Sequence, residues 1–198
     1  MAAAVDLNRV KKELKDCNKD PETSGIKAEL VHEDDYLHWK GTIKGPITTP
    51  YEGGIFDVDI LLPNDYPFVP PKMKFITKCW HPNISSDSGA ICLDILKTEW
   101  SPALTIRTAL ISLQALLSAA EPDDPQDAVV AKQYKEHHQE FMKTAKFWTE
   151  TYAGAQAGDS EKLEQLMSMG FEKAKCVAAL SKAKGDVNAA TEALLSDM

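Results

Sequence analysis

The spacing of hydrophobic residues changes twice along the first half of the chain. Apolar residues three or four positions apart mark one face of a helix over residues 5–19, namely Leu7, Val10, Leu14 and Cys17. Four β-prone runs separated by Pro and Gly clusters follow, at residues 26–31, 36–44, 55–62 and 73–77. In the third run, apolar residues at even positions alternate with mostly acidic ones, which is the period of a strand with one buried face. The pattern therefore predicts an N-terminal helix and a four-stranded antiparallel meander.

Helical spacing returns in the second half of the chain. Periodicity is absent over residues 93–102, and a helix is then predicted over residues 105–119 from Ile106, Leu110, Leu113 and Leu117. Pro122 and Pro125 interrupt the pattern, because proline lacks the backbone donor and fixes the backbone. We expect a short helix over residues 127–135 next. A further amphipathic helix is marked by Phe141, Ala145, Trp148 and Tyr152.

The end of the chain reads as a second, smaller domain. Residues 153–158 are Ala-Gly-Ala-Gln-Ala-Gly, a small and uncharged run with nothing to bury, which predicts a linker. Beyond it, apolar spacing indicates three short helices, with Asp186 placed to cap the last. We predict a first domain over residues 1–152, a linker over 153–159 and a three-helix domain over 160–198. The fold class is α+β, with the later helices of the first domain packed on the meander.

The composition and charge of the chain exclude some classes of binding partner. The chain has 198 residues, of which 43% are hydrophobic and 26% charged, as in an ordinary soluble globular protein. Its net charge of −8 argues against a surface that neutralises nucleic-acid phosphates. No apolar run approaches the roughly 20 residues that span a bilayer, and the N-terminus lacks the apolar core of a signal peptide. We therefore expect no nucleic acid, no membrane partner and a cytoplasmic or also nuclear location.

Four cysteines, Cys17, Cys79, Cys92 and Cys176, are spaced too irregularly for a zinc site or a disulfide framework, so reduced thiols are expected. Cys92 stands out because it follows a glycine-containing loop and precedes the aperiodic segment, where a large partner can reach a nucleophile. On its own, a cysteine between two aliphatic residues is more often packed than catalytic. The sequence shows no phosphate-binding glycine loop, no Ser-His-Asp order and no zinc-ligand set, which predicts neither a cofactor nor a metal.

Six motifs decide the interpretation of Cys92. They are Tyr-Glu-Gly-Gly (51–54), Tyr-Pro-Phe-Val-Pro-Pro (66–71), His-Pro-Asn-Ile (81–84), Gly-Ala-Ile-Cys-Leu-Asp (89–94), Trp-Ser-Pro-Ala-Leu-Thr (100–105) and Pro-Asp-Asp-Pro (122–125). In composition and order they resemble the signature of ubiquitin-conjugating enzymes, over about residues 4–152. The tail, with Met169-Gly170-Phe171 and a late pair of leucines, resembles a ubiquitin-associated (UBA) domain. The whole chain resembles the UBA-tailed type of the family.

The resemblance implies a role for Cys92. The family's cysteine accepts ubiquitin from the activating enzyme by transthiolation and carries it as a thioester, which a lysine amine then attacks. The side-chain amide of Asn83 is suited to stabilise the tetrahedral oxyanion. Alternatively, Asn83 pins the loop that separates it from Cys92 through hydrogen bonds to the backbone.

Asp124 matches the acid of the family that favours loss of a proton from the attacking lysine. Asp124 could also be an ordinary turn residue, because aspartate is common in turns such as Pro-Asp-Asp-Pro. Asp123 stands in the same turn, so only the position in the motif distinguishes Asp124 from it. His81 is expected to be a structural, hydrogen-bonded residue. The thiol has no basic residue within its motif, so we expect its reactivity to come from positioning.

Two further surfaces follow from the resemblance. Ligase docking in the family uses the first helix and two loops, which here carry Arg9, Lys12, Phe68, Ser101, Pro102 and Ala103. Phe68, on a loop made rigid by prolines, is suited to act as an anchor, or it could cap the core. In the tail, ubiquitin binding is implied for Met169, Gly170, Phe171 and Leu195. The alternative is that Met169 and Phe171 are core residues of a minimal bundle.

The leading function is therefore ubiquitin transfer that builds polyubiquitin chains, of a proteasome-directing linkage according to the resemblance. The implied partners of this monomer are ubiquitin, the ubiquitin-activating enzyme, RING-type ubiquitin ligases and substrate proteins. A non-catalytic ubiquitin adaptor is a second interpretation, but inactive members of the family lack the cysteine. A thiol redox protein is a third, and it lacks a second cysteine at exchange spacing.

Overall fold

The computed structural model describes residues 5–154, 165–171, 173–183 and 186–196. The chain divides into two compact units, residues 1–152 and 153–198. Most of the predicted linker lies outside the described residues. The expectation that its first residue has nothing to bury is wrong, because Ala153 is fully buried at the end of a π-helical turn, Thr149–Ala153. Among the described residues, no helix combines the length and the apolarity needed to cross a membrane.

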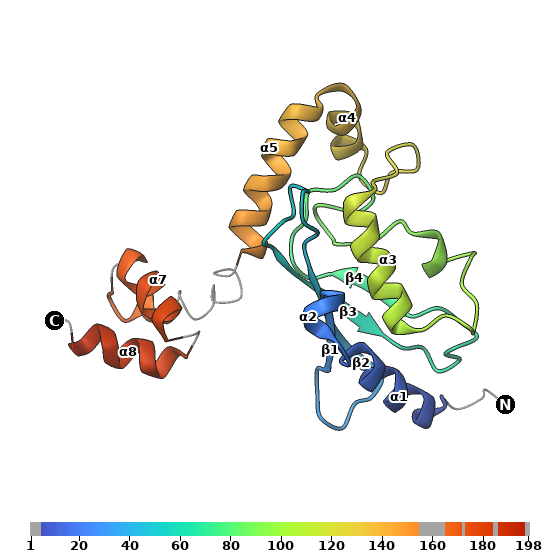
Figure 1. The fold of residues 1–198 in the computed structure, drawn as a ribbon, viewed down its shortest axis with the longest axis horizontal. Coiled ribbons are helices and arrows are strands. Elements are labelled where there is room, and N and C mark those ends of the chain that lie inside the picture. Colours follow the sequence, from blue (N-terminus) through green and yellow to red (C-terminus); the bar gives the residue numbers. More distant parts are fainter. Residues whose placement is uncertain (1–4, 155–164, 172, 184–185, 197–198) are drawn as a thin grey trace. The chain divides into compact units, whose positions relative to one another are not determined.

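A four-stranded antiparallel sheet forms the centre of the first unit (Figure 1). Its strands are β1 (Ile26–Leu30), β2 (His38–Lys44), β3 (Ile55–Leu61) and β4 (Lys72–Phe75). Each strand pairs with its neighbour in sequence, which confirms the predicted meander. Pairing of Trp39 with Ile60 and of Ile43 with Phe56 places large apolar side chains on one face of the sheet, where all four are fully buried.

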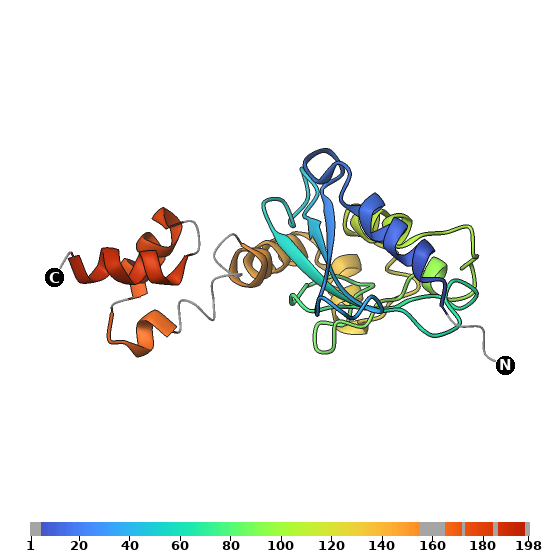
Figure 2. The same cartoon turned by 90° about the horizontal axis from the view of Figure 1, so that it is seen from below.

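Helix α3 (Ile106–Ser118) covers that apolar face. The other helices of the first unit are α1 (Leu7–Cys17), α2 (Pro21–Ser24), α4 (Ala128–Glu136) and α5 (His138–Trp148). The two views show α1 beside α3, which lies over β1 and β2 (Figures 1 and 2). Gly41 permits this close approach, because a Cβ there would lie 2.8 Å from a methyl carbon of Leu110. The remaining helices, α4 and α5, pack against each other.

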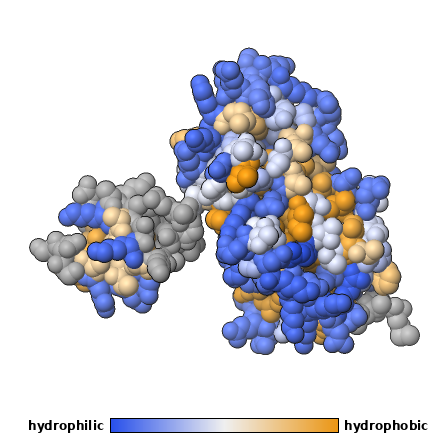
Figure 3. Space-filling view, viewed as in Figure 1, coloured by the Kyte–Doolittle hydropathy of each residue, from blue (hydrophilic) through white to orange (hydrophobic). Residues whose placement is uncertain are grey.

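Local residue chemistry fixes the ends of these helices. Asp6 caps α1 by accepting hydrogen bonds from the backbone N–H groups of Asn8 and Arg9, and Thr105 caps α3 by accepting one from Thr108. The chain contains two elements that the sequence pattern did not reveal, namely α2 and a 3₁₀ turn over Asp94–Leu96. On the face shown in Figure 3, hydrophobic residues of the first unit form separate patches between polar ones.

The second unit has its own small core. Residues 165–168 are helical and are followed by α7 (Lys173–Lys182) and α8 (Val187–Ser196). Six buried residues from these segments pack together: Leu166, Cys176, Ala179, Leu180, Ala190 and Leu194. Asp186 caps α8 as predicted, because its Oδ1 accepts hydrogen bonds from the backbone N–H groups of Asn188 and Ala189.

Candidate active site

The four thiols differ in their exposure to solvent. Cys17, Cys79 and Cys176 are buried, whereas Cys92 is partly exposed. Burial raises the pKa of Cys17 to about 12 and also raises the pKa of Cys79, which keeps both thiols protonated at neutral pH. Cys92 is therefore the cysteine that a macromolecular thioester can reach.

A glycine turn brings the chain to Cys92. Gly89 has a φ of +74°, and a Cβ at this position would lie 2.0 Å from the carbonyl oxygen of Phe75. The same close approach lets the Gly89 carbonyl accept a hydrogen bond from the backbone N–H of Phe75 at the end of β4. Three residues later, the backbone N–H of Cys92 donates to the carbonyl oxygen of Asn83 at 2.9 Å. The sheet thus fixes the backbone on which the thiol stands.

An acidic and a basic side chain flank the sulfur. Cys92 Sγ donates a hydrogen bond to Asp124 Oδ2 at 3.4 Å, and Lys97 Nζ donates to Cys92 Sγ at 3.2 Å. The structure therefore brings Asp124, from the loop after α3, together with Cys92. It also separates Asp124 from its neighbour, because Asp123 is paired instead with Lys135 at 2.6 Å.

Lys97 is the neighbour that the sequence interpretation missed. The motif itself carries no basic residue, as predicted, but a lysine three positions beyond its end reaches the sulfur. The 3₁₀ turn over Asp94–Leu96 reverses the chain, and the backbone N–H of Lys97 donates to the carbonyl oxygen of Asp94 at 2.8 Å. Hydrophobic periodicity does not detect such a turn. The sequence therefore gave no indication that Lys97 contacts Cys92, five positions before it.

Asn83 is buried, with 1% of its surface exposed, and its side chain is fully hydrogen-bonded. Its Nδ2 donates to the carbonyl oxygens of Glu121 and Asp124, both at 2.9 Å, and its Oδ1 accepts from the backbone N–H of Glu121 at 2.8 Å. The expectation that Asn83 pins the loop leading to Cys92 is wrong in its target, because these bonds hold residues 121–124 instead. The amide fixes the backbone of the segment that carries the Asp124 carboxylate.

Ser86, on the loop before Cys92, and Asp127 form a second clamp, which the sequence did not reveal. Asp127 Oδ2 accepts hydrogen bonds from the hydroxyl and the backbone N–H of Ser86, at 2.6 and 3.1 Å. Asp127 Oδ1 caps α4. Burial alone would raise the pKa of Asp127, but the hydrogen bonds from Ser86 and from α4 lower it, which keeps the carboxylate charged. The loop before Cys92 is thereby tied to the start of α4.

His81 is a structural residue, as predicted. It is fully buried, with Nε2 within 2.9 Å of the carbonyl oxygen of Leu116 and Nδ1 accepting from the backbone N–H of Asn83. Burial outweighs the hydrogen bond to Leu116 and lowers the pKa of His81 to about 4, so the ring is neutral at pH 7. His137 and His138 are exposed, and no group of residues in the described ranges is arranged to hold a metal ion.

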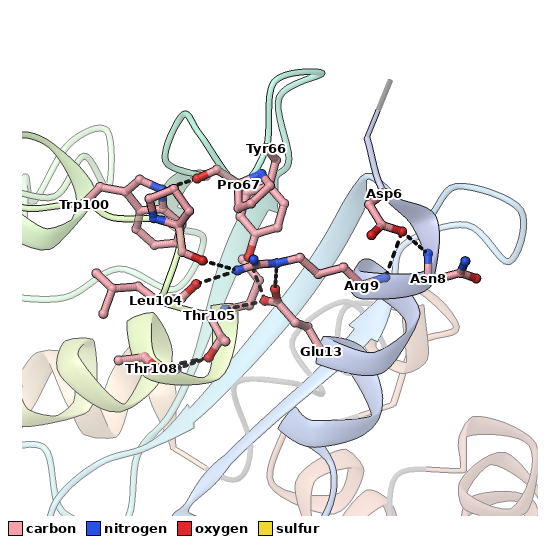
Figure 4. A network of polar contacts seen from close by, with 12 residues as sticks. Asp6, Asn8, Arg9, Glu13, Tyr66, Pro67, Trp100, Leu104, Thr105 and Thr108 are labelled. Atoms are coloured by element: carbon pink, nitrogen blue, oxygen red, sulfur yellow. Dashed lines mark hydrogen bonds and ion pairs between the residues drawn. The ribbon is translucent and has the colours of Figure 1, made fainter. Parts of the chain in front are cut away.

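The predicted ligase-contact residues lie on three segments that touch one another. Arg9 Nη2 donates to the carbonyl oxygens of Pro102 and Leu104, at 2.8 and 2.9 Å (Figure 4). Phe68 is 73% exposed and does not cap the core. Lys12 is also exposed, as are Ser101, Pro102 and Ala103. The two loops are joined by a hydrogen bond of 2.7 Å from Trp100 Nε1 to the carbonyl oxygen of Pro67.

The predicted ubiquitin-binding residues of the second unit divide into two groups. Met169 and Leu195 are 56% and 58% exposed. Gly170 has a φ of +94°, the left-handed conformation expected at the end of the helical segment. Phe171 instead packs against the buried cluster of this unit, as the alternative interpretation proposed.

Comparisons with known proteins match both units of the chain. Residues 9–149 match the family model for ubiquitin-conjugating enzymes, and residues 158–194 match the model for UBA/TS-N domains. Ubiquitin-conjugating enzyme E2 27 of Arabidopsis thaliana is 55% identical, over 97% of this chain and 99% of that relative. Ubiquitin-conjugating enzyme E2 K of Homo sapiens is 53% identical, over 98% of this chain and 100% of that relative.

Solved structures show the same fold. The E2 domain of a Toxoplasma gondii ubiquitin-conjugating enzyme superimposes with a TM-score of 0.70 at 58% identity, covering 75% of this chain and 99% of that domain. A putative ubiquitin-conjugating enzyme from Plasmodium yoelii gives a TM-score of 0.71, also at 58% identity, over 78% of this chain and 99% of its own. The chain therefore belongs to the ubiquitin-conjugating enzymes, a family of ubiquitin transferases, and carries a C-terminal UBA domain.

Proposed function

We propose that this enzyme carries ubiquitin as a thioester on Cys92 and transfers it to lysine amines of substrates and of ubiquitin itself. The observation that carries the proposal is the accessible Cys92 thiol, 3.4 Å from the carboxylate of Asp124. Charging is a thioester exchange: the sulfur of Cys92 attacks the ubiquitin thioester of the activating enzyme, whose own sulfur leaves as a thiolate. ATP is consumed in that earlier activation and is not needed by this chain.

Transfer to lysine requires a neutral amine. An exposed lysine has a pKa near 10.4, so it must lose a proton as it approaches the thioester. The carboxylate of Asp124 is placed to accept that proton, or to hold the amine in position until the proton leaves. The amine then forms an amide bond with ubiquitin while the carbon–sulfur bond breaks, and the positive charge of Lys97 stabilises the sulfur anion that leaves.

Asn83 acts first through the position of Asp124. Both hydrogens of its amide are engaged by carbonyl oxygens, which favours a role in holding residues 121–124. Donation to the oxyanion would require one of these bonds to open during the reaction.

A gel assay tests the proposal. The protein is incubated with ubiquitin, activating enzyme and ATP, and the products are run with and without reductant. We expect an added band that reductant removes and that the Cys92→Ser variant lacks. If wild-type protein forms no such band, the proposal is wrong and the adaptor interpretation replaces it; ubiquitin binding by the second unit is then the quantity to measure.

We infer that the exposed Met169 and Leu195 bind the apolar face of ubiquitin and hold an acceptor or a growing chain near the thioester. Deletion of residues 153–198 should then leave charging of Cys92 intact and weaken chain extension at limiting ubiquitin. Met169→Asp should weaken extension in the same way, whereas the matched control Lys182→Glu, at an exposed position of α7, should not. Equal chain yields with and without the second unit would contradict this role.

Resemblance to the UBA-tailed type of the family supports two finer proposals. Chains should favour a proteasome-directing linkage, which mass spectrometry of the digested products would show as one predominant modified ubiquitin lysine. RING-type ligases should accelerate discharge of the thioester from a monomeric enzyme. We also propose a cytoplasmic or also nuclear location, which imaging of a fluorescent fusion would test.

A further inference from the structure

A buried carboxylate connects three distant parts of the first unit. Glu13 lies on α1 with 5% of its side chain exposed. Its Oε1 accepts a hydrogen bond from Arg9 Nε at 2.7 Å, and its Oε2 accepts from the hydroxyl of Tyr66 at 2.7 Å and from the backbone N–H of Ile106 at 2.9 Å (Figure 4). Burial of a charge is unfavourable unless the charge is fully hydrogen-bonded, and these three donors supply that compensation.

The three donors come from segments that are far apart in sequence. Tyr66 belongs to the loop that carries Phe68, and Ile106 is the first residue of α3, directly after the loop that carries Ser101–Ala103. The first backbone N–H of α3 therefore points at the carboxylate. Burial first, and then the hydrogen bond to Glu13, raise the pKa of Tyr66, so its hydroxyl remains a donor.

Arg9 extends the network to the second loop. While Glu13 holds Nε, the Nη2 atom of Arg9 binds the carbonyl oxygens of Pro102 and Leu104. The guanidinium carbon also lies 5.6 Å from the ring centroid of Tyr66. The guanidinium group of Arg9 thus binds groups of its own chain. These contacts require several donors held in one plane, which a lysine lacks.

We propose that Glu13 is a positioning residue for ligase recognition, which sets the spacing between the Phe68 loop and the Ser101–Ala103 loop. Arg9 acts through the same network rather than as a free cation that meets the ligase. This inference rests on the proposed ligase surface and adds to it a buried residue that no ligase touches. The competing interpretation is that Glu13 only stabilises the fold.

Two conservative substitutions show whether Arg9 acts through the network or as a free cation. Glu13→Gln keeps the shape of the side chain but turns one oxygen into a donor that faces Arg9. Arg9→Lys keeps the positive charge but loses the fork that contacts Glu13 and the two carbonyl oxygens together. If Arg9 is a free cation, Arg9→Lys behaves as wild type; if it acts through the network, Arg9→Lys behaves as Glu13→Gln.

The functional measurement is single-turnover discharge of the thioester to free lysine, with isolated RING domains titrated in. Each ligase-stimulated rate is divided by the ligase-independent rate of the same variant, so that a general loss of fold or chemistry cancels. The half-maximal RING concentration should rise about tenfold in Glu13→Gln and in Arg9→Lys, and no further in the double variant. The control Asp16→Asn, which removes an α1 carboxylate paired with Lys19, should leave the half-maximal RING concentration unchanged.

Amide hydrogen exchange tests the positioning itself, without a ligase. Residues 63–69 and 98–105 should exchange faster in Glu13→Gln than in wild type. Tyr66→Phe, which removes one of the three hydrogen bonds, should give an intermediate increase and covers the case in which Glu13→Gln does not fold. Unchanged exchange in both segments would overturn the inference.

The outcomes also separate this inference from the proposed function. Failure of wild-type protein to form the thioester would overturn the proposed function, and hydrogen exchange would still decide the role of Glu13. A charged wild type that responds to no RING domain would overturn the ligase surface. A wild-type ligase response in Arg9→Lys would overturn the network role of Arg9.

Discussion

Removal of the Asn83 side chain should damage both stability and transfer. Asn83→Ala deletes three hydrogen bonds to the backbone of residues 121–124 and leaves the Glu121 N–H and two carbonyl oxygens without these partners. At a net contribution of about 1 kcal/mol each, the free energy of unfolding should fall by about 3 kcal/mol. For a chain of this size, that loss corresponds to a decrease in Tm of roughly 6–12 °C.

Tryptophan fluorescence is the appropriate probe of that loss. All four tryptophans lie within residues 1–152, so their emission follows unfolding of the first unit alone. Asn64→Ala, at an exposed asparagine of the same unit, is the matched control and should leave the Tm unchanged. An unchanged Tm in Asn83→Ala would refute the account of Asn83 as a clamp.

Transfer rates then distinguish the two roles of the amide. If Asn83 acts through the position of Asp124, adding Asp124→Ala to Asn83→Ala should slow lysine discharge little further, because both changes remove one function. If Asn83 also stabilises the oxyanion, Asn83→Ala alone should slow discharge by about 10²- to 10³-fold, and the two effects should multiply. Both rates are measured by single-turnover discharge after charging has been stopped.

Three further predictions concern the same site. His81 is neutral in the folded protein with a pKa of about 4 and takes up a proton near pH 6.5 once unfolded. As the pH drops from 6.5 to 4, this difference should lower the free energy of unfolding by about 3 kcal/mol. Urea unfolding at several pH values measures the total slope, and the slope of His81→Gln should be smaller by this contribution. Asp124→Asn should slow lysine discharge by about 10²-fold while charging persists, and Asp123→Asn should not; equal effects in a discharge assay would contradict the assignment. Gly89→Ala should lower the free energy of unfolding by at least about 2 kcal/mol, as measured by urea unfolding, because the new Cβ meets a carbonyl oxygen and the backbone is left-handed; a wild-type midpoint would show that this turn can shift at little cost.

Helices and strands were predictable because their evidence is local. The apolar stripe of α1 and the alternation in β3 each report one buried face, and the predicted ranges differ from the observed ones by one or two residues. Motif order located Cys92 and Asp124. Their contact through a sulfur–carboxylate hydrogen bond depends on a loop that returns to the sheet from 32 positions away.

Other parts of the site depend on contacts that spacing does not encode. Lys97 reaches the sulfur through a 3₁₀ turn, and Ser86 meets Asp127 across 41 positions. Glu13 left one trace in the sequence, as a charged residue three positions after Val10 and four before Cys17, on an otherwise apolar helix face. A charge at such a position indicates a buried partner, but the partners Tyr66 and Ile106 are visible only in three dimensions.

The most direct test of the central claim is to locate the acyl bond. Wild-type protein charged with ubiquitin, activating enzyme and ATP is examined by intact-mass spectrometry, and then digested without reductant to map the attachment. We expect a mass increase of one ubiquitin less one water, attached at Cys92 and removed by a thiol reductant. An adduct that survives reductant, or one attached to Cys17, Cys79 or Cys176, would contradict it.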